Sequence, residues 1–228
     1  APSLDVVGPL TKDVADSAAV LSVLTGRDYE TGLEQGVKGL RVGLPQEYWQ
    51  AGLAENMLAQ IQQAADSLTA GGCQVQPVSL PTSQHGLRAY YVIAPAELAQ
   101  ALASLGQGLA PAERSALLGA EAKRRLLTGT FYQQTEAGKA YYQKACQVRT
   151  LIQQEFCQIF QQVDLLLAPC VRQTAFLLDA APEDPVEMYQ NDLLLAPVNL
   201  SGICALSLPY GQVGALPGAV QLIAGPNQ

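Results

Sequence analysis

An alternation of strand-like and helix-like apolar patterns near the start of the chain is the strongest constraint on its fold. Residues 40–44 (L-R-V-G-L) alternate apolar and other side chains, as in a strand. Residues 55–69 carry apolar side chains every three or four positions, which predicts a helix. Residues 73–80 predict a second strand, and Pro77 favours its placement at a sheet edge. This order predicts a βαβ-like unit and an at least partly parallel sheet.

The rest of the chain continues the alternation of helices and strands. The longest predicted helix spans residues 139–163, and its apolar stripe comprises Ala145, Val148, Ile152, Phe156, Ile159 and Val163. Other helices are predicted at residues 12–25, 87–105 and 112–127, and other strands at residues 164–168, 204–208 and 219–224. We therefore expect an α/β fold in which helices surround a mixed β-sheet.

Composition excludes several classes of protein. The chain of 228 residues is 49% apolar and 14% charged, so it can bury a sizeable core. Its net charge of −7 argues against a broad phosphate-binding surface. His85 is the single histidine and the five cysteines form no C-x-x-C pair, so we predict no metal site and reduced thiols, typical of a cytoplasmic protein. We find no signal peptide and no apolar run of membrane-spanning length, so no membrane partner is expected.

Common catalytic motifs are missing from the sequence. There is no G-x-S-x-G elbow, and one histidine gives little support to a Ser-His-Asp triad. No phosphate-binding loop and no dinucleotide fingerprint occur. From these patterns alone, we expect a soluble, ligand-binding α/β domain.

Five segments, in order along the chain, carry a resemblance to a known family. They are S-L-D…G-P at residues 3–9, A-Y-Y-V-I-A-P-A-E at residues 89–97, K-R-R-L-L-T-G-T-F at residues 123–131, A-Y-Y-Q-K-A-C-Q-V-R-T at residues 140–150, and M-Y-Q-N-D at residues 188–192, which runs on to P-V-N-L-S-G at residues 197–202. Together they resemble the amidase-signature family, and within it the A subunits of glutamyl-tRNA(Gln)/aspartyl-tRNA(Asn) amidotransferases. The resemblance runs over nearly the whole chain. It implies that residues 1–228 are the C-terminal portion of a single amidase-signature domain, an incomplete fold whose N-terminal part is absent.

The resemblance implies that the catalytic groups lie outside this chain. The family uses a Ser–Ser–Lys triad, and the S-L-D…G-P segment follows the motif that holds its nucleophile. Because that segment stands at residues 3–9, the triad is expected upstream of residue 1. We therefore assign no catalytic residue and expect the chain to be inactive by itself.

The resemblance also places three substrate-binding residues in this chain: Tyr90, Arg125 and Asp192. The planar guanidinium of an arginine pairs bidentately with an α-carboxylate, an aspartate accepts from an α-ammonium, and a tyrosine offers a hydroxyl and a flat wall. Without the family, each has another explanation. Arg125 could lie on a solvated helix face, Asp192 could cap a helix and Tyr90 could pack in the core.

The implied function is glutamine hydrolysis for a tRNA-dependent amidotransferase. The ammonia would convert Glu-tRNA(Gln) to Gln-tRNA(Gln), or Asp-tRNA(Asn) to Asn-tRNA(Asn), which is a ligase reaction. The whole enzyme would be a heterotrimer in which this subunit has partner subunits B and C. This chain is expected to bind no cofactor, since ATP and Mg²⁺ belong to the partner, which would also hold most of the mischarged tRNA. The alternatives are an amidase acting on small amides and a non-catalytic fragment that binds a partner.

Several stretches depart from the family pattern. Residues 132–138, 170–173 and 203–204 differ from the usual sequence, and the stretch between Glu97 and Glu121 is shorter than in the family. These departures affect the walls of the expected pocket and leave the three proposed contacts in place.

Overall fold

The computed structural model describes residues 1–104, 111–178 and 188–226, and these form a mixed sheet covered by helices. The sheet order is β2-β1-β3-β5-β4. β1 is parallel to β2 and β3, whereas β5 is antiparallel to β3 and β4. The predicted α/β class and mixed sheet are confirmed. The strands are β1 (Arg41–Pro45), β2 (Gln74–Val78), β3 (Leu165–Pro169), β4 (Cys204–Val213) and β5 (Leu216–Ala224).

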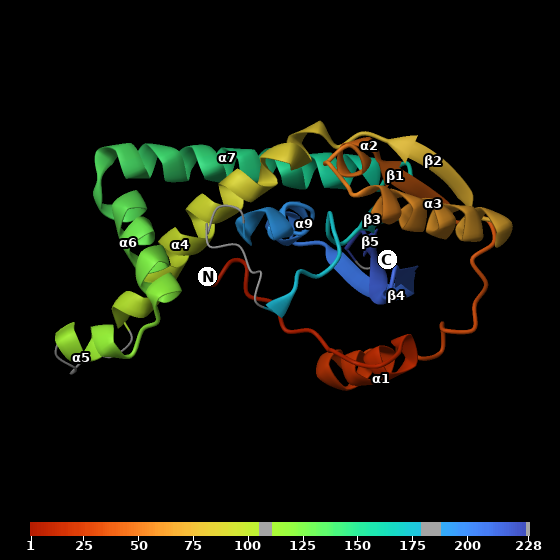
Figure 1. Ribbon diagram of the computed structural model, residues 1–228, viewed down its shortest axis with the longest axis horizontal. Coiled ribbons are helices and arrows are strands. Elements are labelled where there is room, and N and C mark those ends of the chain that lie inside the picture. The colour runs from red at the N-terminus through yellow and green to blue at the C-terminus, as the bar shows by residue number, and fades with distance from the viewer. Residues whose placement is uncertain (105–110, 179–187, 227–228) are drawn as a thin grey trace.

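Helices extend well beyond the sheet. Figure 1 shows α7 crossing the molecule from the sheet to α6, with α4 beside it and α1 set apart. The α-helices are α1 (Val14–Thr25), α2 (Gln46–Trp49), α3 (Glu55–Ala70), α4 (Gly86–Ser104), α5 (Pro111–Ala116), α6 (Ala120–Gln134), α7 (Glu136–Ile159) and α9 (Ala196–Ser201). Two 3₁₀ turns, η1 (Pro81–His85) and η3 (Gln190–Asp192), precede α4 and α9.

The predicted βαβ unit is present as β1, α3 and β2. β1 and β2 pair in parallel from Arg41↔Gln74 to Pro45↔Val78. β2 is an edge strand, as Pro77 predicts, because a proline has no N–H to donate to a second neighbour. A fully buried side chain, Ile61, anchors α3 to this part of the sheet.

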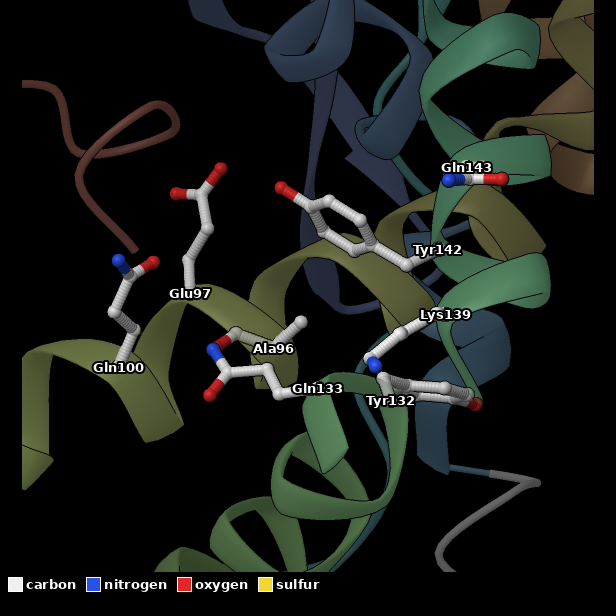
Figure 2. Close-up of a pocket in the computed structure, with 8 residues that line it drawn as sticks. All are labelled: Ala96, Glu97, Gln100, Tyr132, Gln133, Lys139, Tyr142 and Gln143. Atoms are coloured by element: carbon white, nitrogen blue, oxygen red, sulfur yellow. The ribbon is translucent and has the colours of Figure 1, made fainter. Parts of the chain in front are cut away.

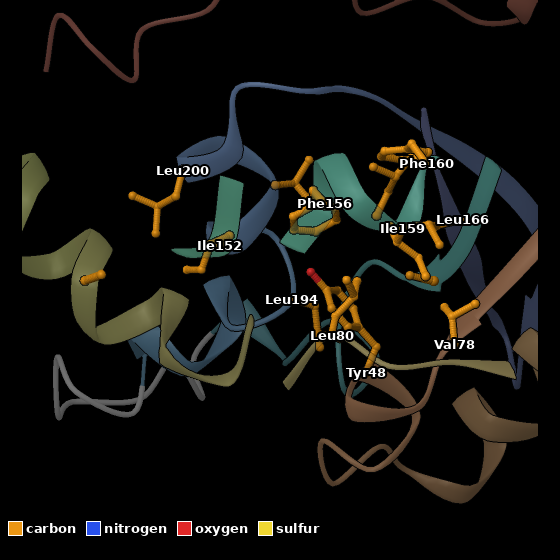
Figure 3. Close-up of a cluster of buried hydrophobic side chains, with 14 of the residues drawn as sticks. Tyr48, Val78, Leu80, Ile152, Phe156, Ile159, Phe160, Leu166, Leu194 and Leu200 are labelled. Carbon is orange, nitrogen blue, oxygen red and sulfur yellow. The ribbon is translucent and has the colours of Figure 1, made fainter. Parts of the chain in front are cut away.

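The apolar stripe of α7 forms the main core. Ala145, Ile152, Phe156 and Ile159 are buried, and Val163 is buried just beyond the helix end. Figure 3 shows Ile152, Phe156 and Ile159 among residues from several other elements of the same core, which include Tyr48, Leu80, Leu166, Leu194 and Leu200. α7 begins earlier than predicted, because Thr135 caps it by accepting a hydrogen bond from the N–H of Gly138 at 2.9 Å.

Two helix predictions need comment. The single helix predicted at residues 112–127 is wrong: α5 ends at Ala116, and α6 starts after Gly119, whose backbone is extended at φ −68° and ψ 166°. The helix predicted at residues 87–105 is confirmed as α4, although residue 105 lies outside the described residues.

α1 matches the predicted residues 12–25 to within two positions, and the side chain of Asp13 caps its start by accepting from the N–H of Asp16. Its apolar side chains are only partly buried. Ala18 is buried, but Leu24 is 56% exposed. In the described part of the chain, α1 thus presents an apolar face to solvent.

The C-terminal strands are longer than predicted. The strands at residues 204–208 and 219–224 are the inner parts of β4 and β5, which pair as a hairpin. Gly214, with φ +66°, forms the two-residue turn with Ala215, because the left-handed backbone that such a turn needs favours glycine. The sequence patterns did not reveal this hairpin.

Helices α4 and α6 approach each other closely at Gly129. A Cβ at this position would overlap the carbonyl of Pro95 and lie 2.9 Å from the Cβ of Ala99. Gln133, one turn further along α6, donates its side-chain amide to the carbonyl of Ala96. The absence of a side chain at Gly129 therefore sets the distance between the two helices.

We predict that Gly129→Ala destabilises the fold by about 2–3 kcal/mol, since the new methyl group forces α6 away from the backbone of α4. Gly119→Ala is the matched control at the start of the same helix, because a Cβ at Gly119 meets nothing within 4 Å. It should cost no more than about 1 kcal/mol as a change of N-cap residue. Urea denaturation followed by circular dichroism measures both, and equal stabilities would contradict the close approach.

Candidate functional site

Arg125 and Asp192, two of the three predicted substrate contacts, meet at Tyr91. Tyr91 lies on α4 and its hydroxyl donates to Oδ2 of Asp192, at the end of η3, over 2.7 Å. The guanidinium carbon of Arg125, on α6, lies 5.5 Å from the centroid of the Tyr91 ring. Three elements far apart in sequence thus place a cation, a phenol and a carboxylate together.

A second tyrosine extends this arrangement. The ring of Tyr189 stacks on that of Tyr91, with centroids 3.8 Å apart and an interplanar angle of 25°. The guanidinium carbons of Arg125 and Arg124 lie 5.8 Å and 5.2 Å from the centroid of Tyr189. Cation–π attraction of this kind contributes about 0.5–1 kcal/mol at partly exposed sites. The two rings therefore help to hold the guanidinium of Arg125 in one orientation.

Glu121 completes the charged part of the site. Its Oε1 accepts from Nε of Arg125 at 2.6 Å and from the hydroxyl of Tyr189 at 3.1 Å. Its other carboxylate oxygen pairs with Arg124. The Glu121 side chain is 47% exposed and that of Arg125 is 31% exposed, so the pair contributes little to stability. We call Tyr91, Glu121, Arg125, Tyr189 and Asp192 the Tyr91 cluster.

Tyr90, the third predicted contact, lies next to this cluster. Its ring packs edge-on to Tyr91, with centroids 5.3 Å apart, and against the main core. Its hydroxyl has no hydrogen-bond partner among the described residues, whereas Tyr91 binds Asp192. Contact of Tyr90 with a substrate stays a prediction. The family resemblance pointed to Tyr90, and the contacts of its neighbour Tyr91 were not foreseen from the sequence.

Gln221 of β5 fixes the segment that carries Asp192. This side chain is 1% exposed, and its Nε2 donates to the carbonyl of Pro169 at 2.9 Å and to that of Leu194 at 3.2 Å. Leu194 follows Asp192 by two residues. The sheet therefore positions η3, a link that the strand pattern of residues 219–224 did not reveal.

Burial raises the pKa of Tyr91, and its hydrogen bond to Asp192 raises it further, against a lowering effect of Arg125. A tyrosine hydroxyl is protonated at neutral pH without any shift, and the raised pKa extends this to more alkaline solution. Tyr91 is therefore a hydrogen-bond donor at neutral pH, and Asp192 is the acceptor that it orients.

A cavity of about 370 Å³ lies elsewhere, between α4, α6 and α7. Figure 2 shows the carboxylate of Glu97 and the hydroxyl of Tyr142 on the same side of this cavity. Glu97 also accepts from the backbone N–H of Ser3 at 2.8 Å and from its hydroxyl. Arg149 donates to the hydroxyl of Ser3 at 2.6 Å. The cavity thus borders the N-terminal segment, and the three predicted substrate contacts do not line it.

The described part of the chain offers no grouping of three histidine, cysteine, aspartate or glutamate residues suited to a metal ion. All five cysteines are free. Within the same ranges, every helix is too short or too polar to cross a membrane.

The sequence is similar to those of proteins of one known family. The profile of the family described as Amidase matches residues 1–228. The A subunit of glutamyl-tRNA(Gln) amidotransferase from Synechococcus sp. (strain RCC307) is 41% identical, over 98% of this chain and 52% of the relative. The protein of the same name from Desulforudis audaxviator (strain MP104C) is 37% identical, over 99% of this chain and 51% of the relative.

Solved structures show the same relationship. A crystal structure of the A subunit of glutamyl-tRNA(Gln) amidotransferase from Thermotoga maritima superimposes with a TM-score of 0.78 at 31% identity, over 98% of this chain and 49% of that one. A bacterial aryl acylamidase, at 22% identity and a TM-score of 0.74, shares the fold over 95% of this chain and 49% of its own. The chain spans about half the length of the curated relatives it matches.

The fold is that of the amidase-signature enzymes, represented here in part. The chain belongs to the amidase family, and the curated relatives named above are A subunits of glutamyl-tRNA(Gln) amidotransferases.

We predict that Tyr91→Phe destabilises the protein by about 1–2 kcal/mol, because Asp192 loses its phenolic donor in a half-buried site. Tyr90→Phe is the matched control from the same tyrosine pair and should change stability by less than about 0.5 kcal/mol. Denaturation midpoints of the two variants test this. A larger loss for Tyr90→Phe would contradict the hydrogen bond from Tyr91.

Proposed function

We propose that this chain forms the glutamine-binding part of the A subunit of a tRNA-dependent amidotransferase. One observation carries the proposal: Arg125 and Asp192, which are 67 residues apart, both contact Tyr91. The likeness to curated A subunits over nearly the whole chain supports the choice of glutamine as the ligand.

The Tyr91 cluster supplies a group for each charge of a free amino acid. Arg125 would bind the α-carboxylate through its planar guanidinium. Asp192, held by Tyr91, would accept from the α-ammonium. Tyr90 would contribute its hydroxyl or its ring to the wall of the site. When both charges of glutamine are bound, its side-chain amide is held in one orientation. Such positioning of a reacting group is a large part of catalytic acceleration.

In the whole protein, a Ser–Ser–Lys triad would attack this amide and release ammonia. We propose that the triad belongs to the portion of the amidase-signature domain that the relatives have and residues 1–228 do not span. The contacts of Ser3 with Glu97 and Arg149 support this arrangement, because they dock the start of the chain onto α4 and α7. That docking would fix the approach of a preceding segment.

The ammonia would serve partner subunits B and C in the cytoplasm. There, ATP and Mg²⁺ bound by the partner would activate Glu-tRNA(Gln), or Asp-tRNA(Asn), before amide transfer. The net charge of −7 supports the assignment of most tRNA contacts to the partner, since phosphate binding depends on lysine and arginine.

The first test is direct binding of L-glutamine to the chain by isothermal titration calorimetry. Arg125→Ala and Asp192→Asn should each weaken binding by about 10-fold or more, because each removes a charge-assisted hydrogen bond. Lys123→Ala, which removes an exposed cation from the same helix, is the control and should leave the dissociation constant unchanged. If neither Arg125→Ala nor Asp192→Asn changes the dissociation constant of L-glutamine, the proposal is wrong.

We also predict that residues 1–228 alone release no ammonia from L-glutamine, because the proposed nucleophile lies in sequence that they do not include. A coupled glutamate dehydrogenase assay measures this. Turnover that requires Arg125 would show that the chain holds its own nucleophile and would overturn this part of the proposal.

A further inference from the structure

Glu121 makes a contact with Arg125 that the proposed substrate binding does not use. The two residues stand four apart on α6, so their side chains share one face of the helix. The bond runs from Nε of Arg125 to Oε1 of Glu121 at 2.6 Å. The same oxygen accepts from the hydroxyl of Tyr189 at 3.1 Å, which fixes the carboxylate from a second direction.

This contact decides which part of the guanidinium is available. An arginine has five N–H donors in a rigid fork, and Glu121 takes the one on Nε. The rings of Tyr91 and Tyr189 lie 5.5 Å and 5.8 Å from the guanidinium carbon. The two terminal nitrogens have no hydrogen-bond partner among the described residues. The end of the Arg125 guanidinium, where each terminal nitrogen carries an N–H parallel to the other, is therefore available to a further partner.

We propose that Glu121 is a positioning residue that holds Arg125 for end-on pairing with the α-carboxylate of the substrate, and so makes the site selective for amino-acid amides over simple amides. This inference rests on the proposed glutamine site and adds a residue that acts through Arg125. A bidentate pair needs both donors in one plane with the carboxylate, so a guanidinium free to rotate binds more weakly.

The opposite role for Glu121 is that of a competitor of the substrate carboxylate for Arg125. If its carboxylate held the place of the substrate carboxylate, the removal of Glu121 would tighten binding. The bond to Nε argues for positioning, because it leaves both terminal nitrogens available at the same time. The sign of the change in affinity thus separates the two roles.

Removal of Glu121 should leave the fold intact. The Glu121 side chain is about half exposed and that of Arg125 about a third, so only a small loss of stability is expected from breaking this pair. A change in ligand binding would therefore come from the orientation of Arg125 rather than from unfolding. Circular dichroism of each variant verifies this.

The experiment compares two ligands by calorimetry: L-glutamine and 4-aminobutanamide, which is glutamine without its α-carboxylate. Glu121→Ala should raise the dissociation constant of L-glutamine about 10-fold, which corresponds to about 1.4 kcal/mol. The dissociation constant of 4-aminobutanamide should change by less than about twofold. Glu121→Gln keeps an acceptor for Nε and should recover part of the loss. Glu136→Ala breaks a comparable surface pair with Lys139 on α7 and should change neither ligand.

Each other outcome contradicts the inference. Tighter or unchanged L-glutamine binding in Glu121→Ala excludes positioning of Arg125. An equal loss for both ligands indicates a general structural role. If Arg125→Ala abolishes L-glutamine binding while Glu121→Ala does not alter it, the proposed function stands and this inference fails. If the unaltered chain does not bind L-glutamine, both fail.

Discussion

The close approach of α4 and α6 at Gly129 holds the candidate site together. Gly129 lies against the carbonyl of Pro95. Gly129 stands one turn after Arg125 on α6, and Pro95 stands one turn after Tyr91 on α4, so the contact lies next to two members of the Tyr91 cluster. A side chain at Gly129 would separate the helices and lift the guanidinium from the ring. The packing of two helices thus sets the geometry of a charged site that is itself partly exposed.

Two further contacts fix the remaining groups. Gln221, buried on β5, ties the segment after η3 to the sheet and so places Asp192 within reach of Tyr91. Glu121 orients Arg125 from within α6. Together these contacts hold a cation and a carboxylate at fixed places without fully burying either. A preorganised site of this kind would orient a zwitterionic ligand at little further cost in entropy.

The features predicted from the sequence are those that depend on local pattern. The period of the apolar residues in α7 and the β1–α3–β2 alternation follow from burial of one face, and both are confirmed. The break at Gly119 and the cap at Thr135 were missed, because single polar or glycine residues decide them. The family resemblance supplied Arg125 and Asp192, whereas the other members of the Tyr91 cluster act through tertiary contacts that no local pattern encodes.

A crystal structure of the chain with bound L-glutamine would show directly whether the Tyr91 cluster is the amino-acid site. We expect the α-carboxylate on the terminal nitrogens of Arg125 and the α-ammonium on Asp192, with Glu121 still on Nε. Glutamine bound instead in the cavity beside Glu97 and Tyr142, with Arg125 and Asp192 making no contact to it, would contradict this assignment.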